Sequence, residues 1–216
     1  MPIQDLKDNY ISTINLVSYA KKHHVKRFLF ASSMSVYGDN TKGTNPKTNY
    51  GVHKLSSELF LKNNLQDIPV LILRFFNVYG PGQDLVDLKQ GMVSIFVSQA
   101  ISTDKIKVKG SLKRSRDFVY IQDLVDFISL EIISNKNQSG CVIYDIASGQ
   151  SLTVKILIDE IMNQWGPKTI EVLPGTPGDQ FEVYSTNSAL EKVLGRPTIK
   201  IYEGLRLWKK EIESKF

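Results

Sequence analysis

The sequence predicts an α/β fold in which helices cover a parallel sheet. Three short runs rich in apolar and aromatic residues are typical of strands buried on both faces of such a sheet: residues 25–31 (VKRFLFA), 70–75 (VLILRF) and 141–147 (CVIYDIA). Stretches with helical spacing of apolar residues precede, separate and follow these runs, as is typical of parallel sheets. With 216 residues, of which 42% are hydrophobic, the chain is long enough for one sizeable core or a large domain with a small appendage.

The first half of the chain is predicted to hold two helices and two strands. In order, these are a helix over residues 5–22, the strand over 25–31, a polar loop over 39–49, a helix over 50–63 and the strand over 70–75. Leu6, Tyr10, Ile14 and Val17 recur at helical spacing along one face of the first helix.

The second half is predicted to continue the alternation with shorter elements. The expected elements are helices over 93–101, 121–133, 153–165, 188–194 and 202–214, and strands over 105–108, 141–147 and 170–173. Pro81, Gly82 and Gly91 mark the loop before the first of these helices. Lysine alternates with apolar residues over 105–108, which is typical of an exposed edge strand. Ser151 or Thr153 is expected to cap the helix over 153–165.

The predicted sheet is incomplete. Three strands are few for a doubly wound sheet, and the chain opens with a helix. None of the 14 glycines belongs to a G-x-G-x-x-G or G-x-x-G-x-x-G turn of the kind that cradles dinucleotide phosphates. Gly80-Pro81-Gly82 follows a strand, but it has a proline and lacks a third glycine. We therefore expect this chain to lack the glycine-rich part of a dinucleotide-binding fold.

Composition indicates an ordinary globular protein without a membrane span, a metal site or a nucleic-acid partner. Charge is mildly basic, at +5, and the basic run over 105–116 has no interleaved aromatic residues. His23, His24 and His53 show no metal-ligand spacing with cysteine or carboxylates. The single Cys141, with no signal peptide and no long apolar run, predicts a soluble, cytoplasmic protein.

Tyr50 and Lys54 are the most informative pair of residues. At positions i and i+4 of a helix they point the same way, and a nearby ammonium favours the phenolate, which would lower the phenol's pKa. A serine hydroxyl at the end of strand 25–31 could share a substrate oxygen with that phenol. Together these groups suit proton transfer during oxidation and reduction of a carbinol, although a surface helix pair is the simpler reading of the tyrosine and lysine alone.

Several motifs occur in the order found in one enzyme family. They are residues 28–38 (FLFASSMSVYG), the Y-x-x-x-K of Tyr50 and Lys54, residues 73–82 (LRFFNVYGPG), residues 116–124 (RDFVYIQDL) and residues 9–13 (NYIST). The chain resembles the later part of the extended short-chain dehydrogenase/reductase family, specifically the NAD-dependent nucleotide-sugar epimerases and dehydratases such as UDP-glucose 4-epimerase. The resemblance runs almost from end to end of the chain. It implies a partial Rossmann-like parallel sheet flanked by helices, with a small C-terminal substrate-binding lobe.

The resemblance assigns the catalytic roles. Tyr50 would remove a proton from a sugar hydroxyl while hydride passes to NAD, and Lys54 would bind the nicotinamide ribose and lower the tyrosine's pKa. Ser33, chosen by its position before Val36-Tyr37-Gly38, would hydrogen-bond the same sugar oxygen. Tyr50 and Lys54 thus count as both catalytic and cofactor-binding residues, and Ser33 as both catalytic and substrate-binding.

Three more residues receive ligand roles from the resemblance. Phe75 would lie beside the nicotinamide, although a core aromatic is an equal alternative. Asn77 would contact the diphosphate of the nucleotide sugar; its alternative is a turn-forming asparagine. Arg116 would also bind the diphosphate, and its alternative is a solvated cation in the basic run.

Departures from the family pattern favour epimerisation and put substrate affinity in question. Met34 and Ser35 stand where the family's dehydratases usually carry acidic residues, and Ser35 also stands where its decarboxylases tend to carry a glutamate. A nucleotide-sugar dehydratase or reductase remains an alternative. Thr176 replaces an arginine that grips the diphosphate, and Thr186 replaces a common aspartate.

The expected organisation has two parts. Residues 1–150 form a truncated Rossmann-like portion, with 77–117 contributing to the substrate lobe, and residues 151–216 form that lobe. A homodimer through the helices over 5–22 and 50–63 is expected by resemblance. The alternative is a non-catalytic remnant, or a half-enzyme that needs a separate N-terminal partner carrying the dinucleotide site. The motifs select neither the sugar, the nucleotide, nor NAD over NADP.

Overall fold

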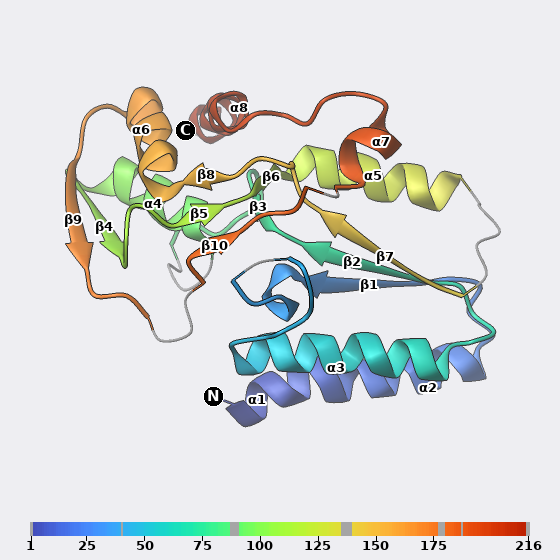
Figure 1. The fold of residues 1–216 in the computed structure, drawn as a ribbon. Coiled ribbons are helices and arrows are strands. Elements are labelled where there is room, and N and C mark those ends of the chain that lie inside the picture. Colours follow the sequence, from blue (N-terminus) through green and yellow to red (C-terminus); the bar gives the residue numbers. More distant parts are fainter. Residues whose placement is uncertain are drawn as a thin grey trace.

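A three-stranded parallel sheet lies at the centre of the protein. The computed structural model describes residues 2–39, 41–86, 91–134, 140–176, 180–186 and 188–214. Strands β1 (Phe28–Ser33), β2 (Val70–Phe75) and β7 (Cys141–Ile146) pair in the order β1-β2-β7, all parallel. The three predicted strands thus form one sheet, flanked by helices on both faces (Figure 1), which confirms the predicted fold class.

Strand β2 is buried on both faces because its side chains alternate between two cores. Val70 and Ile72 pack into one core, while Leu71 and Leu73 pack into the other. This alternation follows from the period of two along a strand. Strand β2 thus has the burial on both faces that its apolar run predicted, whereas β1 and β7, for which the same burial was predicted, are only partly buried because each lies at one side of β2.

Two long helical segments cover one face of the sheet. The first begins with α1 (Pro2–Leu6), continues through a π-helical turn (Lys7–Ile11) and ends as α2 (Ser12–Lys22). The second is α3 (Asn49–Asn64). Figure 1 shows α2 and α3 side by side beneath the sheet. Their buried apolar residues join Val70 and Ile72 in one core.

Helices α5 (Ile121–Ile133) and α7 (Leu190–Leu194) cover the opposite face. Phe127 of α5 is fully buried there, and Leu190 of α7 joins the same core as Leu71 and Leu73. Although α7 follows residue 151, it packs on the Rossmann-like layer and not in the lobe.

A second lobe has its own core, centred on Trp208. The helices of this lobe are α4 (Met92–Ser102), α6 (Val154–Trp165) and α8 (Ile201–Glu213). Its strands are β3 (Asn77–Tyr79), β4 (Lys105–Lys109), β5 (Ser115–Arg116), β6 (Phe118–Tyr120), β8 (Leu152–Thr153), β9 (Thr169–Leu173) and β10 (Glu182–Val183). Residues before and after β7 thus build the lobe together.

Strand β4, helix α5 and the start of helix α6 can each be compared with the sequence prediction. In β4, the lysines are exposed while Ile106 and Val108 are buried, and the strand pairs with β9 in parallel. The thirteen-residue α5 also has the predicted bounds. Thr153 accepts a hydrogen bond from the Ile156 amide and so caps α6, which decides between the two cap candidates. In the described ranges, no helix combines the length and apolar character needed to cross a membrane.

Candidate active site

Helix α3 begins against the turn that follows β1. The Thr48 hydroxyl accepts a hydrogen bond of 3.1 Å from the Gly51 amide, so the helix starts at Asn49 and Tyr50 lies in its first turn. A Cβ atom on Gly51 would lie only 2.2 Å from the Ser35 carbonyl oxygen. The absence of a side chain at Gly51 therefore lets the helix approach this turn closely.

Ser33 ends β1 and faces the start of α3. Its hydroxyl accepts a hydrogen bond of 3.1 Å from the Ser35 amide and lies 3.2 Å from the Ser35 hydroxyl. Neighbouring Ser32 is buried and donates to the Glu58 carboxylate instead. Successive strand residues point to opposite faces, so of the two serines Ser33 is the one whose side chain acts on the Tyr50 phenol.

The Tyr50 phenol is held in its neutral form. Burial raises the phenol's pKa most strongly, the hydrogen bond with Ser33 lowers it, and the Asp5 carboxylate raises it further. The net direction is upward, so the expected lowering of this pKa by Lys54 is wrong for the structure described. The reason is that burial disfavours the phenolate more than the neighbouring groups favour it.

Lys54 lies one turn after Tyr50 and faces the sheet. Its ammonium donates to the Ala31 carbonyl oxygen at 2.9 Å and lies 5.1 Å from the centre of the Phe30 ring and 5.6 Å from that of Tyr50. Burial lowers the pKa of Lys54, and the Asp5 carboxylate opposes that change. Ser33, Tyr50 and Lys54 therefore come together at the carboxyl end of β1.

Sequence reasoning missed an acidic residue next to this group. Asp5 Oδ2 lies 2.6 Å from His53 Nδ1, and the Asp5 charge acts on both Tyr50 and Lys54. The His53 side chain is therefore half-buried and paired with Asp5. The i+3 spacing of His53 from Tyr50 could have indicated that His53 lies near the site. No pattern in the sequence, however, indicates that His53 pairs with Asp5, 48 positions earlier.

Phe75 and Asn77 lie at the end of β2 and just beyond it. Phe75 pairs in register with Ser33 but packs against the core shared with α5. The Asn77 amide group donates to the Asp117 carbonyl oxygen at 2.8 Å and to the Met34 sulfur at 3.5 Å. Asn77 therefore touches the turn after Ser33, whereas the side chain of Phe75 contributes to the core.

Arg116 is buried in the lobe and is connected to the loop after Ser33 through Gln180. Its guanidinium donates to the backbone carbonyls of Ser115, Phe181 and Gln180, and burial lowers its pKa to about 10. The Gln180 side chain in turn donates to the carbonyls of Tyr37, at 2.9 Å, and Gly38. Arg116 is thus not the solvated cation of the alternative reading; it ties the lobe to the loop after Ser33.

A basic pocket of about 490 Å³ opens between α4 and β4. The residues around it combine cationic and apolar side chains: Met92, Ile95, Phe96, Gln99, Lys107, Lys109, Arg114, Leu173 and Thr176. Residues 177–179, which follow Thr176 in the motif, lie outside the described residues.

Comparison with known proteins identifies the family. Residues 1–147 match the model of the NAD dependent epimerase/dehydratase family. The chain belongs to this family. It is 30% identical over 217 residues to a provisionally named UDP-glucose 4-epimerase of Methanocaldococcus jannaschii, covering 95% of this chain and 69% of that protein.

Other members of the family carry out different reactions on related substrates. The chain is 27% identical to the dTDP-4-dehydro-6-deoxyglucose reductase of Escherichia coli, over 98% of this chain and 69% of the relative. The crystal structure of the Thermotoga maritima UDP-glucose 4-epimerase with UDP-glucose superposes with a TM-score of 0.88 at 25% identity, over 100% of this chain and 72% of that one. The chain thus spans about two thirds of the length of these relatives.

NAD is the cofactor of the epimerase/dehydratase family, as expected. The residues at the carboxyl end of β1 suit the ribose end of that molecule, since open parallel sheets bind ligands at this edge. In the part of the chain that the structure describes, Lys54 uses one of its three N–H groups, on Ala31. The remaining N–H groups are available to ribose hydroxyls.

Proposed function

We propose that this chain carries the catalytic residues of a nucleotide-sugar epimerase that works through a keto sugar. The meeting of Ser33, Tyr50 and Lys54 at the carboxyl end of β1, with Ser33 acting on the Tyr50 phenol, carries the proposal. When NAD is bound, it supplies the hydride acceptor and donor.

The proton steps fall to Tyr50 and Ser33. Tyr50 takes the proton of the sugar hydroxyl during oxidation and returns it when the carbonyl is reduced from the other face. The Ser33 hydroxyl hydrogen-bonds the same oxygen and offsets its changing charge. Tyr50 can take that proton only as the phenolate. Burial raises the pKa of Tyr50 and so favours the neutral phenol, and the Lys54 ammonium, 5.6 Å from the centre of the ring, is the nearby cation that would favour the phenolate.

The turn after Ser33 favours epimerisation over loss of water. A dehydratase needs an acid beside the reacting carbon, yet Met34 there contacts the Asn77 amide and Ser35 is hydrogen-bonded to Ser33. Epimerisation needs no such acid, only rotation of the keto sugar between two hydride steps. A reductase, which needs a single hydride step, is the alternative supported by the E. coli relative.

We further propose that the pocket between α4 and β4 binds the nucleotide. Met92 and Ile95 give the pocket an apolar wall, and Lys107, Lys109 and Arg114 offer positive charge for phosphates. Asn77 donates only weakly to the Met34 sulfur, so that N–H group is available for a diphosphate oxygen. Arg116 would support the diphosphate by holding residues 180 and 181 in place.

Turnover tests this assignment. We expect the full chain with NAD to convert UDP-glucose to UDP-galactose, followed by NMR of the anomeric protons. Tyr50→Phe should reduce the rate about 10²- to 10⁴-fold because the general base is lost. Tyr202→Phe on α8, which removes an exposed hydroxyl, should leave it unchanged. Equal rates for Tyr50→Phe and the parent chain would rule the mechanism out.

Association is part of the proposal, because β1 lies at the edge of the sheet. Ala31 is exposed there, and β1 pairs only with β2 within the described residues. We propose either a homodimer through α2 and α3 or a separate N-terminal half that completes the cofactor site. Calorimetric titration with NAD, at known oligomeric state, distinguishes an active chain, which binds saturably, from a half-enzyme or remnant, which is folded but does not bind.

A further inference from the structure

Glu58 lies on the same stripe of α3 as the two catalytic residues. It follows Tyr50 by eight positions and Lys54 by four, and residues at this spacing share a helix face. Its carboxylate is 3% exposed and receives two hydrogen bonds from Arg74 of β2, at 3.0 Å from Nε and 2.6 Å from Nη2. Ser32 of β1 donates to the same carboxylate. The face of α3 that bears Tyr50 is therefore fastened to both β1 and β2.

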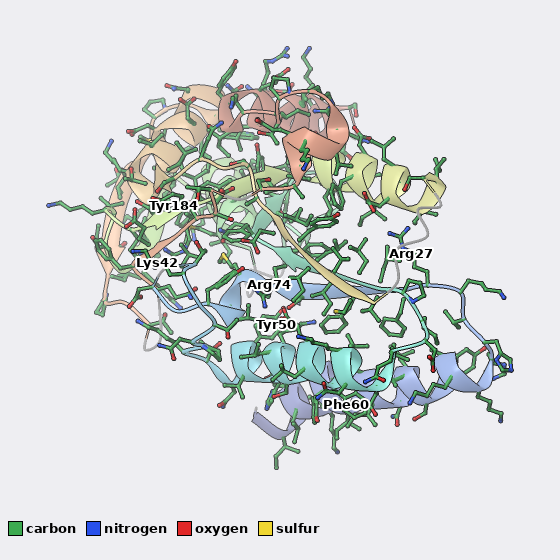
Figure 2. All side chains as sticks on the ribbon, turned by 45° about the vertical axis from the view of Figure 1, so that its right-hand side comes forward. Arg27, Lys42, Tyr50, Phe60, Arg74 and Tyr184 are labelled. Carbon is green, nitrogen blue, oxygen red and sulfur yellow. The ribbon has the colours of Figure 1, made fainter. Side chains whose placement is uncertain are left out.

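Arg74 also holds the loop on the other side of Ser33. Its Nη1 donates to the Tyr37 hydroxyl at 2.8 Å, and the guanidinium lies 4.9 Å from the centre of the Tyr37 ring. The Tyr37 hydroxyl donates onward to Asp145 of β7 at 2.8 Å, and Asp145 accepts a further bond of 2.7 Å from Ser185. Figure 2 shows Tyr50 on the sheet side of α3, with Arg74 above it.

These contacts hold the chain on both sides of Ser33. Ser32, directly before Ser33, is bound to Glu58, and Tyr37, four residues after it, is bound to Arg74. Glu58 and Arg74 form one buried ion pair, so the strand end that carries Ser33 and the helix that carries Tyr50 are held by the same two side chains. A displacement of either element would break charge-assisted hydrogen bonds in a buried site, which are strong.

We infer that Arg74, together with Glu58, is the positioning residue that sets the Ser33 hydroxyl against the Tyr50 phenol. The inference rests on the proposed function only in taking these two groups as the catalytic ones. Arg74 itself touches no reacting atom. Its burial and its fork of donors to two different elements give it this role, since a lysine has no such planar fork.

A second buried ion pair provides a matched control. Arg27, just before β1, donates from Nη2 to Glu131 of α5 at 3.1 Å, and the Glu131 side chain is 1% exposed. The Arg27 and Arg74 side chains are also similarly buried, at 19% and 11% exposed. Arg27→Met thus removes an equivalent buried pair without touching the residues around Ser33.

The test measures the effect of Ser33 on the phenol of residue 50, without turnover. A single 3-fluorotyrosine is placed at position 50 of the full chain, and its phenol is titrated by ¹⁹F NMR. In the parent chain, Ser33→Ala should raise the phenol's pKa, because the lost hydrogen bond favours the phenolate. In an Arg74→Met background, this effect of Ser33→Ala should shrink at least twofold. In an Arg27→Met background, it should be unchanged.

Two milder variants cover the case in which Arg74→Met does not fold. Tyr37→Phe and Glu58→Gln each remove part of the arrangement and should also shrink the effect of Ser33→Ala, whereas Arg74→Lys should restore it only in part. An effect of full size in folded Arg74→Met, or an equal loss in Arg27→Met, would overturn the inference. Because the readout needs no substrate, a chain that shows the coupling but no turnover would refute the proposed function while leaving this inference intact.

Discussion

Asp117 is a buried carboxyl group whose environment should make the stability of the protein depend on pH. Its side chain has no exposed surface and accepts hydrogen bonds from the Ser148 amide at 2.6 Å, the Ser148 hydroxyl at 2.7 Å and the Gly149 amide at 3.0 Å. Burial is the largest effect and raises its pKa to about 6, although these hydrogen bonds lower it. Asp117 thus organises the loop after β7 while its ionisation is disfavoured.

Ionisation of Asp117 should therefore weaken the fold as pH rises. A pKa that is higher in the folded than in the unfolded chain contributes stability below pH 4, and this contribution is lost as pH rises through about 6. The loss is on the order of 3 kcal/mol. Urea unfolding of the parent chain and of Asp117→Asn between pH 4 and 7.5 measures it, because the variant cannot ionise there. The free energy of unfolding of the parent chain should fall relative to that of Asp117→Asn as pH rises from 4 to 7.5. A constant difference between the two would contradict the raised pKa of Asp117.

The residue order around the site could be predicted from sequence, but its electrostatics could not. The i, i+4 spacing of Tyr50 and Lys54 and the Val36-Tyr37-Gly38 sequence after Ser33 placed the three residues correctly at one strand end. The direction of the Tyr50 pKa was wrong because it depends on burial, which packing of α3 on β1 determines. Likewise, no local pattern shows that Glu58 pairs with Arg74.

At the scale of elements, long segments were predictable and short strands were not. The sequence predicted β2 and α5 with their observed bounds because their apolar patterns extend over six or more residues. Strands β5, β8 and β10 have two residues each, too few to show a period, and they exist only because distant segments pair. The second lobe was therefore predicted by resemblance more than by pattern.

The approach of α3 to the turn after β1 depends on a single glycine. We expect Gly51→Ala to destabilise the protein by about 1–3 kcal/mol, because its Cβ would overlap the Ser35 carbonyl oxygen and push the helix outward. The ¹⁹F titration should also show a weaker effect of Ser33→Ala in this background. Gly43→Ala, in the preceding loop, meets nothing within 4 Å and serves as the control in urea unfolding. Equal free energies of unfolding for Gly51→Ala and Gly43→Ala would show that the turn after β1 can move to accommodate the added Cβ atom at no cost in stability.

At the scale of the whole molecule, apolar side chains are exposed along the helices below the sheet. Apart from Tyr50, which lies on the sheet side of α3 (Figure 2), the exposed large apolar residues of the α1–α2 segment and α3 are Ile3, Leu6, Ile11, Leu16, Tyr19, Val52 and Leu59. Exposed apolar residues gathered on neighbouring helices are typical of an interface between protein chains. These residues lie on the helices that bear Asp5 and Tyr50, the proposed general base, so association through them would order the site as well as bury surface.

Dimerisation through α2 and α3 can be tested by substitutions at exposed apolar residues of these helices. We expect the chain to dimerise, and Leu16→Glu or Leu59→Glu to weaken the dimer at least about tenfold, because each change buries a charge in place of roughly 1 kcal/mol of apolar contact. Ile132→Glu on α5 is a matched control: the three side chains are 55%, 56% and 57% exposed, respectively. Sedimentation equilibrium over a range of concentrations measures the effect. A dimer weakened by Ile132→Glu instead would move the interface to the opposite face of the sheet, and a monomer at all concentrations would favour a separate partner.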